Sequence, residues 1–318
     1  MTSLQTIVPI PPSTLHLDHQ RPILLIGSCF TEHISERLAN SGFTVMANPF
    51  GILYNPHSIA ECLLRCRDER TITDADLVCH DGIFHSWLHH SRFSHPDKDI
   101  VLQRCQQSLH SAHQFLQQKP IVILTLGTAY AYHLQGYGIV ANCHKVPATR
   151  FTKQLLTPSH IISTLSQALD GLDSILTISP IRHWADSPHG NQLSKSALML
   201  ATNALPTHYF PAYEIMMDEL RDYRFYEPDM LHPSSLAIDI IWERFCQTYF
   251  TNATLLLAKK YQQLSRMQAH RPAFPESEAY QQHLLKIEEL KSTIEILRNA
   301  PQQSNTTSKH PQEYSPDK

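Results

Sequence analysis

Two short segments of the chain contain the residue types that nucleophilic catalysis requires, and the first is a sharp transition from strand to helix. Ser28 follows Gly27 directly after the apolar run Ile23–Ile26, and Thr31 can cap a helix that begins there. A serine in such a turn has its hydroxyl exposed beside the positive end of the helix and its free amides. Ser28 is therefore a candidate nucleophile, and an ordinary serine at a helix entry is the alternative.

The second segment is the proline-bounded stretch Glu227–Pro233. Asp229 precedes His232 by three residues there, close to the C-terminal end of an alternating strand and helix pattern. At this spacing the carboxylate can orient the imidazole, which then serves as a general base. The pattern indicates a Ser–His–Asp arrangement with Ser28, and a solvated loop histidine is the alternative for His232.

A histidine-rich segment offers a competing chemistry. His85 and His89 could share one face of a helix as zinc ligands, with His90 beside them. No glutamate follows His85, however, although the HExxH pattern of metalloproteases requires one. We therefore expect no metal and no cofactor, and the segment is a polar lid, a substrate contact or a set of structural histidines.

These residues must be positioned by an α/β fold. Short, continuous apolar runs alternate with amphipathic stretches, which is typical of a parallel sheet covered on both faces. In such sheets ligands bind outside the carboxyl ends of the strands, where Gly27, Gly51 and Gly127 fall. The predicted strands cover residues 23–26, 44–47, 121–124, 174–178 and 207–210, and the predicted helices cover 31–42, 56–67, 97–118, 158–170, 192–204, 213–222 and 234–245.

Composition excludes several classes of protein. The 318 residues carry a formal net charge of -3, so there is no basic field to bind nucleic acid. No apolar stretch approaches the ~20 residues needed to span a bilayer. The seven cysteines form no CxxC pair, which predicts reduced thiols rather than a zinc ribbon. We expect a soluble, cytoplasmic protein without nucleic-acid or membrane partners.

The C-terminal part differs in character. Residues 276–300 place Tyr280, Ile287, Leu290, Ile294 and Leu297 at alternating three- and four-residue steps, which predicts an amphipathic helix. This helix packs on its own domain, or it pairs with a partner helix or a second copy of the chain. The predicted organisation is a catalytic domain over 1–265, a helical extension over 266–300 and a disordered tail over 301–318.

Several motifs in order along the chain resemble the GSCFA family, which is placed with the SGNH (GDSL-like) hydrolases. The resemblance covers roughly residues 1–260, and it departs from the family's naming motif at Thr31, where the family has alanine. The matching segments are Gly27-Ser28-Cys29-Phe30, Asn48-Pro49-Phe50-Gly51-Ile52, Tyr54-Asn55-Pro56, Leu126-Gly127-Thr128, Ser179-Pro180-Ile181-Arg182-His183, and Asp222-Tyr223-Arg224-Phe225-Tyr226 leading to Asp229 and His232.

This resemblance implies a three-layer α/β/α sandwich with a parallel sheet in flavodoxin-like order, as in the SGNH hydrolases. It also implies a serine esterase that removes an O-acetyl or other short acyl group from a carbohydrate or small metabolite. Ser28 would be the nucleophile, His232 the general base and Asp229 its orienting partner, with the Gly51 amide in the oxyanion hole. An O-acyltransferase and a non-catalytic protein that binds carbohydrate or a partner are the alternatives.

The third family block departs from its pattern. Gly127-Thr128-Ala129 aligns with GxND, and Ala129 stands where an oxyanion asparagine is expected. The Thr128 hydroxyl, Asn55 or Asn191 would replace that donor, or the donor is missing.

Other residues are candidates for substrate contact or for structure. His89, Arg182 and His183 could contact substrate, with an ordinary salt bridge as the alternative for Arg182. Cys29 is expected to be structural, with its side chain in the core while Ser28 points outward.

Overall fold

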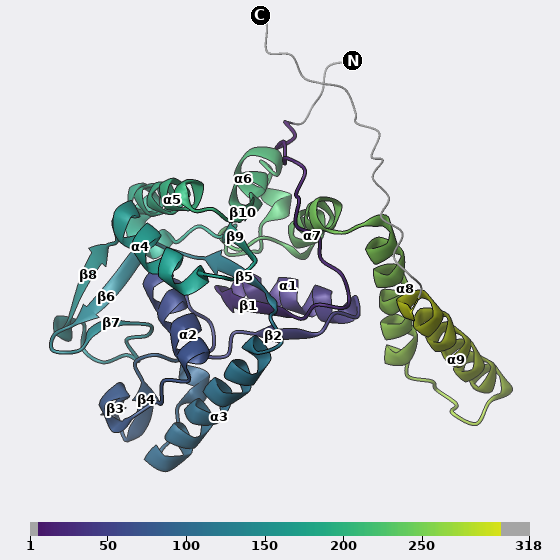
Figure 1. Cartoon of the computed structure of the whole chain (residues 1–318), viewed down its shortest axis with the longest axis horizontal. Coiled ribbons are helices and arrows are strands. Elements are labelled where there is room, and N and C mark those ends of the chain that lie inside the picture. The colour runs from purple at the N-terminus through teal and green to yellow at the C-terminus, as the bar shows by residue number, and fades with distance from the viewer. Residues whose placement is uncertain (1–5, 300–318) are drawn as a thin grey trace, which may run out of the picture. The chain divides into compact units, whose positions relative to one another are not determined.

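A five-stranded parallel sheet forms the centre of the fold (Figure 1). The computed structural model of the chain describes residues 6–299, so the tail predicted over 301–318 lies outside the described residues. The chain divides into two compact units, one ending at Gln262 and one beginning at Gln263. The central strands are β1 (Ile23–Gly27), β2 (Val45–Ala47), β5 (Ile121–Leu126), β9 (Ser174–Ile178) and β10 (His208–Phe210).

The strand order confirms the predicted topology. The sheet runs β10-β9-β5-β1-β2, and numbering these five strands along the chain gives the order 2-1-3-4-5 of flavodoxin-like folds. Ile23 of β1 is paired with Val45 on one side and with Ile121 on the other. All five strands are parallel, so their carboxyl ends meet at one edge of the sheet.

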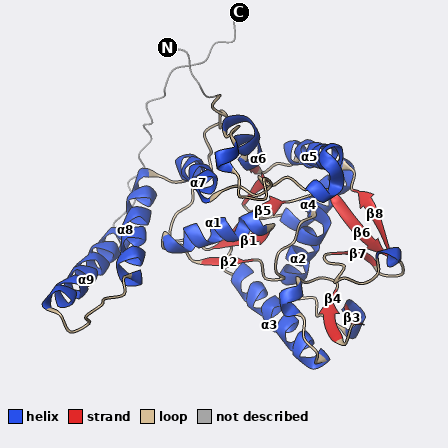
Figure 2. Cartoon of the chain, turned by 180° about the vertical axis from the view of Figure 1, so that it is seen from behind, coloured by secondary structure: helices blue, strands red, loops and turns tan. Residues whose placement is uncertain are grey.

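Helices cover both faces of the sheet and make three layers (Figure 2). Leu24 and Ile26 point to one face and Ile23 and Leu25 to the other, as strand geometry requires. The first face is covered by α2 (Pro56–Asp68), α3 (Lys98–Leu116), α4 (Pro158–Leu169) and α5 (Ser187–Ala204), and the second by α1 (Cys29–Asn40), α6 (Ala212–Glu214) with the π-helical turn Ile215–Glu219, and α7 (Ser235–Tyr249).

Two small antiparallel elements extend the domain. One is a three-stranded sheet in the order β7-β6-β8. Its strands are β6 (Tyr130–Leu134), β7 (Gly138–Val140) and β8 (Phe151–Leu155), and β6 and β7 form a hairpin around Gly136. The other is the hairpin of β3 (Leu77–His80) and β4 (Ile83–Ser86), which was not expected. His85 lies in β4 and His89 follows its end, so the expectation that they could share a helix face is wrong.

The C-terminal helices are α8 (Asn252–Ala269) and α9 (Glu278–Asn299). α9 buries Ile287, Leu290 and Ile294 along one face, which confirms the predicted amphipathic helix. At its beginning, His283 Nε2 lies 2.9 Å from the carbonyl oxygen of Met267. Within residues 6–299, no helix has the length and apolar character needed to cross a bilayer.

Candidate active site

The turn that follows β1 is built around Gly27. Its φ of +154° lies in the region that favours glycine, and a Cβ there would lie 2.2 Å from the carbonyl oxygen of Thr125. The Gly27 amide donates to Asn48 Oδ1 at 2.9 Å, which ties the end of β1 to the segment after β2. Ser28 is the N-cap residue of α1 and has extended backbone, with φ -70° and ψ 178°. The predicted strand, tight turn and helix are therefore confirmed.

The two side chains of this turn face different surroundings. Ser28 is fully buried at 0% exposure, and its hydroxyl donates to Ser179 Oγ at 3.0 Å. Cys29, the first residue of α1, is partly exposed. The expectation that Ser28 points outward and Cys29 into the core is wrong. Ser28 has extended backbone and Cys29 begins the helix, and at this junction it is the serine that is directed inward.

The loop before α7 brings Asp229 and His232 together. Asp229 Oδ2 lies 2.6 Å from His232 Nδ1, and Asp229 Oδ1 accepts from the amides of Leu231 and His232 at 2.9 and 3.0 Å. The backbone amides, joined by the imidazole, lower the pKa of Asp229 to about 2. The carboxylate is thus charged at neutral pH, and it fixes which ring nitrogen of His232 faces it. Both side chains are about half-exposed.

His232 lies near the carboxyl edge of the sheet. Burial, together with the charges of Lys195 and His232, lowers the pKa of His183 to about 4, and His183 follows β9. Burial also lowers the pKa of His33 on α1, and the charge of His232 adds to this effect. His232 forms no hydrogen bond with Ser28 among the described residues, and the Ser28 hydroxyl donates to Ser179 instead.

A buried lysine at this edge was missed by the sequence analysis. Lys195 of α5 is 1% exposed, and its Nζ donates to the carbonyl oxygens of Gly127 and Ser179 at 2.8 and 2.9 Å. It also lies 4.9 Å from the centre of the Tyr213 ring. Burial lowers the pKa of Lys195 to about 7. Within the described part of the chain no carboxylate forms an ion pair with it, so its charge is compensated by carbonyl and ring dipoles.

The oxyanion donors expected at Gly51 and Thr128 already form hydrogen bonds within the protein. The Gly51 amide donates to the Asn48 carbonyl oxygen at 2.8 Å, so it does not face the turn as a free donor. The Thr128 amide donates to the Tyr54 carbonyl oxygen at 3.1 Å, and the Thr128 hydroxyl pairs with Ser194 Oγ at 2.9 Å. The expectation of an available amide at Gly51 is therefore wrong in this conformation, because the tight turn from Asn48 consumes it.

The two candidate asparagines have structural partners as well. Asn55 is the N-cap of α2, where its Oδ1 accepts from the Ser58 amide at 2.8 Å and its Nδ2 donates to Ser58 Oγ at 3.0 Å. Asn191 Oδ1 accepts from the His183 amide at 2.9 Å. Asn191 therefore fixes the chain after β9, and Asn55 fixes the start of a helix.

Other donors remain at the turn. The amides of Cys29 and Phe30 begin α1. Burial raises the pKa of the Cys29 thiol, and these two amides act in the opposite direction. Asn48 is 1% exposed, and its Nδ2 has no partner among the described residues. No catalytic role was predicted for Asn48, although its φ of +48° marks an unusual backbone position.

His89 and Arg182, two further candidates for substrate contact, lie in different surroundings. His89 is fully buried, stacks on Phe50 with ring centres 4.1 Å apart, and places Nδ1 2.8 Å from Ser86 Oγ. Burial lowers its pKa to about 3, so it is a neutral core histidine. Arg182 lies over the ring of Trp184 at 5.2 Å. In the described part of the chain it forms no salt bridge, the alternative raised for it.

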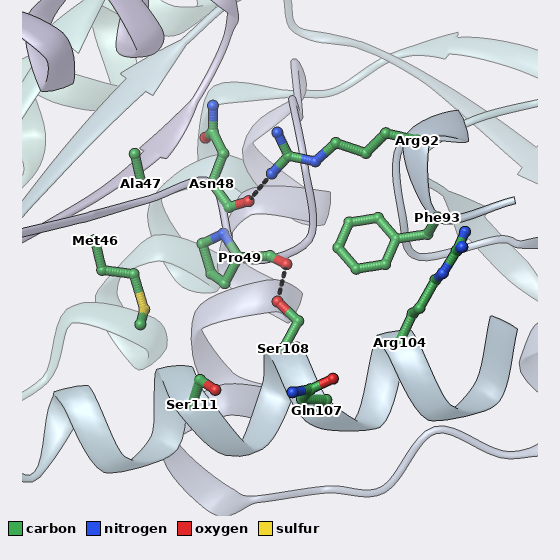
Figure 3. Close-up of a pocket in the computed structure, with 10 residues that line it drawn as sticks. All are labelled: Met46, Ala47, Asn48, Pro49, Arg92, Phe93, Arg104, Gln107, Ser108 and Ser111. Carbon is green, nitrogen blue, oxygen red and sulfur yellow. Dashed lines mark hydrogen bonds between the residues drawn. The ribbon is translucent and has the colours of Figure 1, made fainter. Parts of the chain in front are cut away.

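A cavity of about 520 Å³ lies beside the end of β2 (Figure 3). Arg92 donates to the Asn48 carbonyl oxygen at 2.5 Å, and Ser108 of α3 donates to the Pro49 carbonyl oxygen at 2.5 Å. Arg104 of α3 completes the basic lining. Asn48 lines this cavity and also contacts the β1 turn.

No group of three or more His, Cys, Asp or Glu side chains suited to a metal occurs within residues 6–299.

The parallel sheet and the polar groups at its carboxyl edge define a doubly wound α/β protein, a class in which ligands generally bind outside the strand ends. The sequence model of the GSCFA family matches residues 22–245, most of the chain. The protein therefore belongs to the GSCFA family. Comparison with curated proteins and with solved structures gave no match.

Proposed function

We propose that the protein is a hydrolase of the SGNH type that cleaves a carboxylic ester through an acyl-enzyme formed at the β1 turn. The observation that carries the proposal is the Asp229–His232 pair, in which Asp229 Oδ2 lies 2.6 Å from His232 Nδ1. The charge of His232 also contributes to the lowered pKa of His183, which follows β9 at the carboxyl edge of the sheet. Such a pair supplies an oriented general base to a neighbouring nucleophile. The sequence analysis assigns that nucleophile to Ser28, and the partly exposed Cys29 is its immediate neighbour.

The geometry supports distinct roles for the two residues of the pair. Asp229 occupies the Nδ1 side of the ring, so Nε2 of His232 accepts the proton of the nucleophile and returns it to the leaving alkoxide. The amides of Cys29 and Phe30 begin α1, where the helix dipole favours negative charge. These amides suit the oxyanion that develops on the substrate carbonyl.

The surroundings favour a substrate with a sugar-like or other small polar body. Trp184 is 51% exposed and Tyr54 is 38% exposed, and the Tyr54 ring meets His183 edge-on at 6.0 Å. Exposed aromatic rings beside polar groups accept the apolar face of a sugar ring while its hydroxyls remain hydrogen-bonded. We propose an O-acetyl or other short acyl ester of a carbohydrate or metabolite. All seven cysteines are free, which supports an assignment to the cytoplasm.

Two alternatives share this site. An acyltransferase would use the same acyl-enzyme and pass the acyl group to a hydroxyl in place of water. A non-catalytic binding protein is favoured by Ala129 and by the engaged amide of Gly51, because loss of one oxyanion donor costs on the order of 100- to 1000-fold in rate.

The test is a panel of acetylated sugars and short-chain aryl esters, with acetate and acetylated products both quantified. We expect the wild type to release acetate and His232→Ala to lose most of that activity. His189→Ala, a change at an exposed histidine of α5, is the matched control and should retain it. Acetyl transfer to an added sugar in preference to water would identify the transferase. Sugar binding without turnover would identify the binding protein.

A further inference from the structure

The two potential nucleophiles of the β1 turn, Ser28 and Cys29, differ in their exposure to solvent. Ser28 has no exposed surface, and its hydroxyl proton is directed to Ser179 Oγ at 3.0 Å. Ser179 is itself fully buried and follows β9. A carbonyl carbon cannot reach a hydroxyl in this position unless the turn is rebuilt, whereas Cys29 is partly exposed one residue later.

The hydrogen bonds around Ser28 are those of a structural residue. Its amide donates to the Thr125 carbonyl oxygen at 3.2 Å, and its carbonyl oxygen accepts from Thr31 at 2.9 Å. With the Ser28–Ser179 bond, these contacts tie the ends of β1, β5 and β9 to the first turn of α1. Ser28 thus fixes the backbone from which Cys29 projects.

Cys29 has the surroundings of a thiol that reacts when a base removes its proton. Burial raises its pKa, so the thiol is protonated at neutral pH and requires a base. The amides of Phe30 and Cys29 and the charge of Lys195 act in the opposite direction, toward the thiolate. The charge of Glu32 acts against the thiolate. Burial raises the pKa of Tyr54, and the charge of Cys29 adds to this effect.

The helix that begins at Cys29 is linked to the helix that follows the loop of the general base. His33 follows Cys29 by one helical turn and shares its face, and the charge of His232 reaches His33. Arg37, one turn further, pairs with Asp239 of α7 at 2.5 Å, and α7 begins directly after the Asp229–His232 loop. The ion pair therefore joins the helix that begins at Cys29 to the helix that follows the loop of His232.

We propose that Cys29 Sγ is the nucleophile of this site and that Ser28 is a positioning residue. This inference rests on the proposed ester hydrolysis. The Cys29 proton passes to His232 Nε2, a C–S bond forms to the ester carbonyl carbon, and the C–O bond to the alcohol breaks as His232 protonates the leaving oxygen. Water then attacks the thioester while His232 takes its proton. The C–S bond breaks, the thiol is restored, and the carboxylic acid leaves.

The deciding experiment alkylates the full-length protein with iodoacetamide and follows both ester hydrolysis and the sites of modification by peptide mass spectrometry. Cys79→Ala serves as the background, because Cys79 is an exposed thiol that would otherwise react. We expect hydrolysis to fall in proportion to modification of Cys29, and a competing acetyl ester to slow both. In parallel, the acetyl group of an aryl acetate should map to Cys29.

Matched variants complete the design. Cys29→Ala should lose at least about 1000-fold in kcat, whereas Ser28→Ala should lose less than about 30-fold and keep acylation at Cys29. Circular dichroism checks that each variant is folded, and the alkylation result requires no variant of the turn. Full hydrolysis after complete alkylation of Cys29, or acylation of Ser28 in Cys29→Ala, overturns this assignment and leaves the proposed function intact. An absence of His232-dependent hydrolysis of any ester overturns both.

Discussion

Lys195 is a buried charged residue at the carboxyl edge of the sheet, and its charge acts on other residues of the candidate site. It is 1% exposed, and it bridges the carbonyl oxygens that follow β5 and β9. Burying a charge that has no ion-pair partner is unfavourable unless polar groups replace water around it. The Gly127 and Ser179 carbonyls do so, and the same charge acts on Cys29 and His183.

A pH-dependent stability follows from this lysine. Burial lowers its pKa from 10.5 to about 7, so between these values the unfolded chain binds a proton that the folded chain does not. The contribution of Lys195 to the free energy of unfolding therefore rises with pH in this window, by on the order of 4 kcal/mol in total. Denaturant unfolding of the wild type and Lys195→Met between pH 6.5 and 10 measures it. A stability difference that stays constant with pH would contradict it.

The Asp229 carboxylate is expected to contribute to catalysis and little to stability. Asp229→Asn keeps an oxygen that accepts from the Leu231 and His232 amides, so the loop should persist. It removes the negative charge beside His232 Nδ1, and kcat for ester hydrolysis should fall by on the order of 10³- to 10⁴-fold. Asp170→Asn, at an exposed residue after α4, is the control. Equal kcat values for the two variants would argue against the pair.

At the scale of elements, the junction of β1 with α1 depends on one glycine. Gly27→Ala places a Cβ 2.2 Å from the Thr125 carbonyl oxygen at a φ of +154°, and the neighbouring strand cannot move away. We expect a loss of more than about 3 kcal/mol in the free energy of unfolding. Gly82→Ala, at a φ of +73° with open space around it, should cost only about 1 kcal/mol. Similar unfolding midpoints for both variants would contradict the close-approach argument.

The elements that the sequence predicted are those with a strong local signal. Continuous apolar runs such as Ile121–Leu126 are buried on both faces, and β-strand length and flanking turns identify them. α5 shows why burial within a predicted helix is harder to predict. Leu193 and Leu200 are 43% and 64% exposed, whereas Lys195 is buried, so polarity assigns the wrong face. Only the carbonyl groups at the sheet edge explain this inversion, and they come from distant segments.

The candidate site was predicted where its parts are close in sequence. Asp229 and His232 are three residues apart, and their pairing depends on a local turn. The contrast between Ser28 and Cys29 depends on Ser179, which is 151 residues from Ser28 along the chain. A shift of one residue exchanges the inward and outward directions, and the sequence around Gly27 has no feature that decides between them.

At the scale of the whole molecule, the chain carries its candidate site in the unit that ends at Gln262. We therefore expect changes in α9 to affect stability without affecting ester hydrolysis. Leu290→Asp introduces a charge at a residue that is 8% exposed and should cost about 3 kcal/mol in the stability of the C-terminal helices. Leu285→Asp, at 57% exposure, is the control. Hydrogen exchange over residues 263–299 measures the effect, and a parallel loss of kcat would contradict the separation.

The most direct test of the account asks whether the β1 turn and the Asp229–His232 loop act as one catalytic unit. The measurement is kcat/KM for ester hydrolysis by the wild type, Cys29→Ala, His232→Ala and the double variant. Residues that act together give strongly non-additive losses. We predict that kcat/KM of the double variant is no lower than that of the slower single variant. Losses that multiply in the double variant would show that the two segments act independently and would contradict the account.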